Sequence, residues 1–203
     1  MLTGRRATGT FMASNTTIIE ELAGAARGVG GLLIGNRRAS QHFDFSERGL
    51  AGSFIAFFAV MALNSTLPKL MGATGSTASI FRSAIMMTIL FVFQVGFSMI
   101  VLRQIKRLDG LVPYLVADNW AMFFITIAST LLALFGVTGE IALLAIGLAV
   151  IVVEINIARL IVTLSPLQIA MFIIAQLVGG AIGLFIVGGL FPLSPAEVEA
   201  LAT

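Results

Sequence analysis

The chain has no cysteine and only one histidine, His42, among its 203 residues. Without cysteine it can form no disulfide bond, thiolate metal site or cysteine nucleophile. A single histidine also excludes a metal site built from several imidazole ligands. Charged residues are scarce as well, at 11% of the chain, whereas a soluble domain has about 25%. Few residues are therefore left from which a catalytic or cofactor site could be built.

Apolar residues, in contrast, are abundant, at 58% of the chain. A helix needs about 20 mostly apolar residues to cross a bilayer, and five segments meet this need. They are residues 50–67, 83–102, 114–135, 141–164 and 167–191. The sequence thus predicts an all-α, polytopic membrane helix bundle with five transmembrane helices. Membrane lipids are its first expected partners, and we expect no nucleic-acid partner.

An amphipathic helix is expected before the first span, over about residues 17–34. Thr17 followed by Glu20 matches a capping box. Apolar residues then recur at helical spacing: Ile18, Leu22, Ala25, Val29 and Leu32. The pattern suits a helix that lies on the membrane surface or docks on the bundle. Because four glycines interrupt it, a loosely helical surface segment is the alternative.

The chain divides into a cytoplasmic amino-terminal segment (1–48), a five-helix transmembrane domain (49–192) and a short outer tail (193–203). Asp44-Phe-Ser-Glu47 resembles a second capping box, which would begin the helix that enters the first span. Ten of the twelve basic residues lie before the first span, between the second and third spans, or near the end of the fourth. The positive-inside rule then predicts a cytoplasmic amino terminus and an outer carboxyl terminus.

The stretch VVEINIARLIV, residues 152–162, places polar side chains near the end of the fourth span. The start of the third span lies at a similar depth. We therefore expect a polar intramembrane cluster of Asp118, Asn119, Trp120, Glu154, Asn156 and Arg159, with Asp118 and Arg159 as its ion pair. An ionisable group at that depth must face protein or water. The cluster could lock helices together, with Trp120 in the interfacial belt. It could instead line a path for a proton, ion or solute, or contact a partner subunit or a lipid headgroup.

Small residues recur four apart on the fifth span, at Ala175, Gly179 and Gly183. Such a face lets another helix approach closely, either within this chain or in a dimer. Gln94 and Gln176 lie mid-span, where a lone amide usually forms a hydrogen bond between helices.

No catalytic motif occurs. The sequence has no metalloprotease His–Glu pair, no Gly-x-Ser-x-Gly elbow and no phosphate-binding loop. We therefore expect a protein that is not an enzyme and has no cofactor.

Two stretches, HFDFSERGLAGSF at 42–54 and PYLVADNWAMFF at 113–124, carry a family resemblance. With the five-span plan, they resemble the Yip (Ypt-interacting protein) domain superfamily, and more closely small bacterial membrane proteins placed near it. The matching features are Phe43-Asp44-Phe45-Ser46 before the first span and Asn119-Trp120 at the third. The resemblance implies a non-enzymatic protein of the bacterial inner (cytoplasmic) membrane whose partners or lipids define its role.

Two functions follow as expectations. The first is a protein that binds or organises other membrane components, as an accessory or assembly subunit or a membrane-shaping protein. Its partner would be another membrane protein or a second copy of this chain. The alternative is a small transporter or channel that uses the inner-leaflet acids Asp118 and Glu154.

Overall fold

The computed structural model describes residues 17–70 and 77–192, which form helices joined by short connections and contain no strand. The six α-helices of this part are α1 (Ile18–Leu33), α2 (Glu47–Leu70), α3 (Thr77–Gln104), α4 (Leu111–Leu134), α5 (Glu140–Asn156) and α6 (Pro166–Leu190). Five of them, α2 to α6, are long and apolar enough to cross a membrane. The all-α class with five membrane-spanning helices is confirmed, and these helices contact lipid. The expected tail at 193–203 and the first 16 residues lie outside the described part.

Several span boundaries differ from expectation: α3 begins at Thr77, six residues before the expected start, and two other departures concern the backbone. The α2 backbone stays helical to Leu70 and does not end before Pro68. The expected fourth span, 141–164, is instead α5 followed by a short π-helix, η3 (Ile157–Ile161). Both departures keep the backbone groups of an apolar segment hydrogen-bonded within a helix, as a membrane requires.

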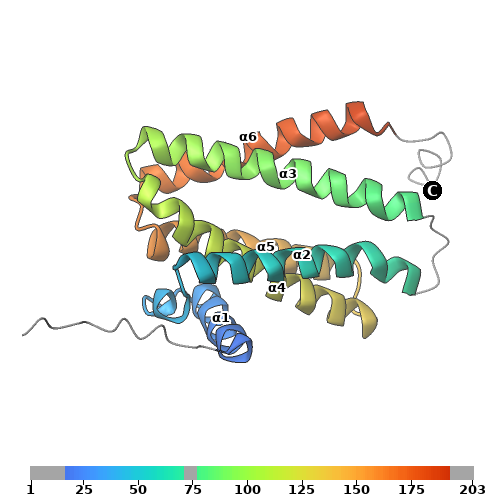
Figure 1. The fold of residues 1–203 in the computed structure, drawn as a ribbon, viewed down its shortest axis with the longest axis horizontal. Helices are drawn as coiled ribbons and strands as arrows, with labels where there is room; N and C mark the ends of the chain where they lie inside the picture. Colours follow the sequence, from blue (N-terminus) through green and yellow to red (C-terminus); the bar gives the residue numbers. More distant parts are fainter. Residues whose placement is uncertain (1–16, 71–76, 193–203) are drawn as a thin grey trace, which may run out of the picture.

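The five long helices form two groups (Figure 1). One is the antiparallel pair of α3 and α6, which share the most extensive contact in the molecule. In the other, α2 packs along α4, and α5 lies beside α4. Helix α1 lies at one end of the bundle, where it contacts α4 and α5. We call this the α1 end and the opposite one the far end.

The buried core is concentrated at the α1 end. The first half of α4, from Tyr114 to Ala121, is buried, whereas Leu131, Leu132 and Leu134 near its other end are exposed. The inner face of α1 contributes Ala25, Val29 and Leu32 to the same core. The two helix groups are therefore joined mainly at the α1 end, and lipid is left to cover much of the far end.

Helix α1 has the expected capping box. Thr17 Oγ1 accepts a hydrogen bond from the backbone N–H of Glu20, and the Glu20 carboxylate accepts one from the N–H of Thr17. At the start of α2, the capping pattern differs from expectation. Ser46, not Asp44, precedes the first helical residue, and its Oγ accepts from the N–H of Gly49. Asp44 instead accepts from the N–H of Ser46, in a turn that leads into the cap.

Ala175, Gly179 and Gly183 lie on α6, and the two glycines face α3 within the same chain. A Cβ added to Gly179 would lie 2.8 Å from the backbone oxygen of Phe93, and one added to Gly183 would lie 3.1 Å from Leu90. At the far end, Arg82 on α3 donates a hydrogen bond to the backbone oxygen of Phe191, just after α6. Because Gly179 and Gly183 have no side chains, α6 can approach α3 closely.

This close approach predicts different effects at two adjacent glycines. Gly179→Ala should lower the stability of the bundle by about 1–3 kcal/mol, because the new methyl group meets the α3 backbone. Gly180→Ala is the matched control, since a Cβ there meets no atom within 4 Å. Thermal unfolding in mild detergent would compare them. Equal midpoints for the two variants would contradict this packing.

A carboxyl pair inside the helix bundle

Two acidic side chains meet inside the membrane-spanning part. Asp118 lies about two turns into α4 and is 5% exposed, and Glu154 lies near the end of α5. Their carboxyl groups are within hydrogen-bonding reach of each other, and neither has a lysine or arginine beside it within the described residues. The Oε2 atom of Glu154 is buried and receives no hydrogen bond there. The pair therefore has no basic counter-ion.

Neutral polar side chains surround the pair. Gln176 on α6 donates from Nε2 to the hydroxyl of Tyr114 at 3.1 Å and also reaches Glu154. Gln94 and Ser98 on α3 lie beside the same hydroxyl. Tyr114 is fully buried and lies one turn before Asp118 on α4. This polar network links α3, α4, α5 and α6 in the region where the two helix groups meet.

A cavity of about 220 Å³ lies between α2, α3 and α4, and Asp118 is the one ionisable side chain among the residues that line it. Polar atoms also come from Gln94, Asn64 and Thr126. Thr126 is two turns beyond Asp118 on α4, or about 12 Å, so the cavity runs from the acid towards the far end. A single water needs only about 10–15 Å³ of such volume. The cavity can therefore bring several waters, or an ion with part of its hydration shell, to Asp118.

Three of the expected cluster residues lie elsewhere. Asn119 donates to Ser53 Oγ on α2 at 3.1 Å, and Asn156 donates to the backbone oxygen of Leu32 on α1 at 2.8 Å. Trp120 is 5% exposed and packs on Phe123 and Phe124, so it is not an exposed belt residue. Helix geometry explains the separation. Residues one and two positions apart point about 100° and 200° apart around a helix.

Arg159 is exposed and forms no ion pair with Asp118, contrary to the sequence-based expectation. It lies in the π-helix η3, five residues beyond Glu154 and on a different face. Asp118 thus faces a second acid in place of a base.

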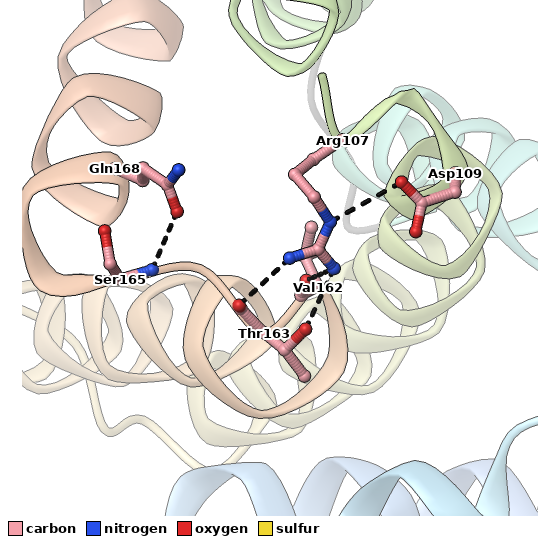
Figure 2. Close-up of polar contacts among 6 residues, drawn as sticks. All are labelled: Arg107, Asp109, Val162, Thr163, Ser165 and Gln168. Atoms are coloured by element: carbon pink, nitrogen blue, oxygen red, sulfur yellow. Dashed lines mark hydrogen bonds and ion pairs between the residues drawn. The ribbon is translucent and has the colours of Figure 1, made fainter. Parts of the chain in front are cut away.

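The π-helix is held at its end by Arg107, from the connection between α3 and α4 (Figure 2). Its guanidinium donates to the backbone oxygens of Val162 and Thr163 and, at 2.9 Å, to Thr163 Oγ1. Its Nε lies 3.5 Å from Asp109. Thr163 has a φ of 59°, which a β-branched residue rarely adopts. Arg107 therefore caps the carbonyl end of the segment that carries Glu154.

Glu21 on α1 has an unusual environment outside the spans. Its carboxylate lies over Gly52 on α2, where a Cβ would overlap it. Burial and the nearby Asp44 raise the pKa of Glu21, while Arg48 opposes this rise. A raised pKa in the fold means that ionisation disfavours the docked state. The contribution of Glu21 to stability is thus greatest below the ordinary glutamate range, and is lost as pH rises through the raised pKa.

Both acids were predicted as site residues from the sequence, whereas Tyr114 and Ser98 were not predicted to be their neighbours. Tyr114 and Asp118 are four residues apart, as are Gln94 and Ser98. Polar residues at this spacing share one helix face. The four-residue spacing shows which side chains share a face of one span. It does not show which spans face each other.

Comparisons with protein-family models, with curated proteins and with solved structures found nothing that matches this chain. They thus give no support to the resemblance to the Yip superfamily. The five membrane-spanning helices stand on the structure alone.

The Arg107 contacts predict a measurable loss of stability. Arg107→Ala should cost roughly 1–2 kcal/mol, because charge-assisted hydrogen bonds to two carbonyls are lost at a partly exposed site. Arg103→Ala is the control, since Arg103 is exposed at the end of α3. Thermal unfolding in detergent would measure both. An Arg107→Ala protein as stable as the control would show that these contacts do not hold η3.

Proposed function

We propose that the chain is a small membrane transport protein that binds a proton or small cation at Asp118 and Glu154. One observation carries this proposal: two carboxyl groups meet within the spans without a basic partner, and one of them lines a cavity. A charged acid in the membrane is costly unless paired, so such residues commonly mark ion or proton pathways. The proposed work is binding and passage without covalent chemistry, which makes the chain neither an enzyme nor a cofactor protein.

The arrangement around the pair supports access from one side at a time. The cavity extends from Asp118 towards the far end. At the α1 end, Tyr114 packs edge-on against Phe172, with 5.0 Å between ring centroids, and Arg107 ties the two connecting loops together. In this conformation, the pair would be reached from the far end and closed off from the α1 end. Passage would then require the α1-end contacts to open.

A structural role for the pair is the competing explanation, because two carboxyl groups that share one proton would also hold α4 and α5 together. Flux measurements separate the two. In proteoliposomes, Asp118→Asn and Glu154→Gln should each lower proton or cation flux by roughly tenfold or more, because the amide cannot exchange a proton. Glu140→Gln is the matched control, since Glu140 is exposed at the far end of the same helix.

The same proteoliposomes can also contradict the proposal. Wild-type flux no greater than that of empty vesicles would overturn it. So would variants that keep flux but unfold at lower temperature, since that result assigns the pair a structural role.

A second candidate function is the binding or organisation of other membrane components, and α1 favours it. Ile18, Ile19 and Ile34 are 81%, 77% and 81% exposed, although the other face of α1 is docked on the bundle. Large apolar side chains in this position suit the boundary between headgroups and acyl chains. The resemblance to the Yip superfamily points the same way, and the partner would be lipid, a second membrane protein or another copy. For either function, we propose a bacterial inner membrane, with α1 on the cytoplasmic side.

Single introduced cysteines would test both α1 and the orientation, since the chain has no native cysteine. Ile18→Cys should react with a lipid-soluble maleimide and resist a water-soluble one, whereas Arg37→Cys, in the exposed polar loop after α1, should react with both. Arg37→Cys should be labelled from the cytoplasmic side, and Thr138→Cys, in the turn between α4 and α5, from the other. Equal labelling of Ile18→Cys by both reagents would contradict membrane contact by α1. Reversed sidedness would contradict the orientation.

A further inference from the structure

The donor atoms around the carboxyl pair are all oxygen or amide groups. The side chains are the two acids, the Tyr114 and Ser98 hydroxyls, and the amides of Gln94 and Gln176. Thiolate and imidazole ligands are missing, because the chain has no cysteine and its single histidine, His42, lies outside the spans. The thioethers of Met61, Met87 and Met122 line the cavity that leads to the pair, whereas the acids themselves are surrounded by the oxygen and amide groups above. Oxygen ligands select hard cations over transition metals. A cation at this site would thus be an alkali or alkaline-earth ion.

Two observations beyond the acidity of the pair point to a ligand. Asp118 is only 5% exposed, yet it lines the cavity, and the hydrogen bond to its carboxyl group within the described residues comes from Glu154, the other acid of the pair. In the described part of the chain, the buried Oε2 of Glu154 lacks a hydrogen-bond donor. Oxygen atoms left without donors in a buried place need a proton, a water or a cation. The site is thus incomplete as the chain alone builds it.

Charge balance limits what can occupy the site. With both carboxyl groups ionised, the pair carries two negative charges that no described basic side chain offsets. Two protons make it neutral, and so do one proton and one monovalent cation. Moving between these two neutral states exchanges one proton for one cation, with no other charge left over.

We propose that the Asp118–Glu154 pair binds one alkali cation, Na⁺ or K⁺, in exchange for one proton. The ion enters through the cavity from the far end and binds the Asp118 carboxylate. The displaced proton leaves the pair, and the remaining proton stays shared between the two acids. This inference rests on the proposed transport function and names its substrate class.

The geometry favours a monovalent over a divalent ion. Ca²⁺ takes six to eight oxygen ligands, several of them carboxylates, and the described residues contain no group of three or more Asp, Glu, His or Cys side chains placed to hold a metal. A divalent ion would also need both acids ionised, which breaks the contact between their carboxyl groups. Neutral amide and hydroxyl oxygens supply the remaining ligands without adding charge, which suits an ion with one charge.

The groups that face the pair determine how it responds to pH. From α4 the titratable neighbour is Tyr114, whereas α3 and α6 contribute only the neutral Gln94, Ser98 and Gln176. Asn64 on α2, which lines the cavity with Asp118, is also neutral. Since an ordinary phenol keeps its proton near neutral pH, proton release from this region on ion binding near pH 7 reports the pair itself.

Proton release from the full chain in detergent tests the inference without requiring transport. NaCl or KCl is added to purified protein in weakly buffered solution with a pH-sensitive dye, and choline chloride serves as the ionic-strength control. We expect about one proton released per bound alkali ion, since metal ions bind the deprotonated form of their ligands. Asp118→Asn and Glu154→Gln should abolish the release, while Glu140→Gln should retain it.

Each result has a distinct meaning. Release of one proton per ion supports the inference even if proteoliposomes show no flux, in which case only the transport function fails. No release with Na⁺ or K⁺ overturns the inference, and proton flux that persists would leave the transport function standing with the proton as its substrate. Release of two protons with Mg²⁺ or Ca²⁺ alone would also overturn it. If the Asn and Gln variants do not fold, Asp118→Glu, which keeps the charge, should fold and retain release with altered ion affinity.

Discussion

The contact between Asp118 and Glu154 is the constraint on which the α1 end of the bundle depends. Two acids in an apolar setting must be neutralised and given hydrogen bonds, or the helices that carry them cannot stay together. The chain meets part of this need with hydroxyls and amides from α3, α4 and α6. The polar network therefore joins the two helix groups in the region where the core is best buried.

Much of the surrounding structure keeps α5 in the right rotation for this contact. Asn156 fixes α5 to the end of α1, and Arg107 fixes the π-helix that follows. Gly110 permits this approach, because a side chain at that position would overlap Val162. A π-turn adds a residue to the helix and changes the direction of the side chains that follow, and such turns are often found at functional sites. Here it lies within a turn of Glu154, between the acid and its anchor.

The sequence predicted the class of fold well, because long apolar runs determine where a chain can cross a membrane. It also predicted α1, since a capping box and a helical apolar period are local signals. It did not predict that Asp118 would face Glu154 and not Arg159. That pairing depends on the rotation of α4 and α5 about their axes, which is set by packing across the bundle. The grouping of Asn119, Trp120 and Asn156 with the acids failed for the same reason, since neighbours along a helix point to different partners. The π-helix at Ile157–Ile161 was not predicted either.

The uneven burial of the bundle has a mechanical consequence. Helices α3 and α6 are bound tightly to each other and contact the other group mainly at the α1 end. If the two helix groups change their angle, they would rotate about the α1 end, beside the carboxyl pair. A small change of angle there is amplified along the part of α6 beyond the pair, from Gln176 to Leu190, which is about 21 Å at 1.5 Å per residue. A change of the ligand bound beside the pair would thus alter the spacing of the helices at the far end, where lipid tails and not side chains resist the motion.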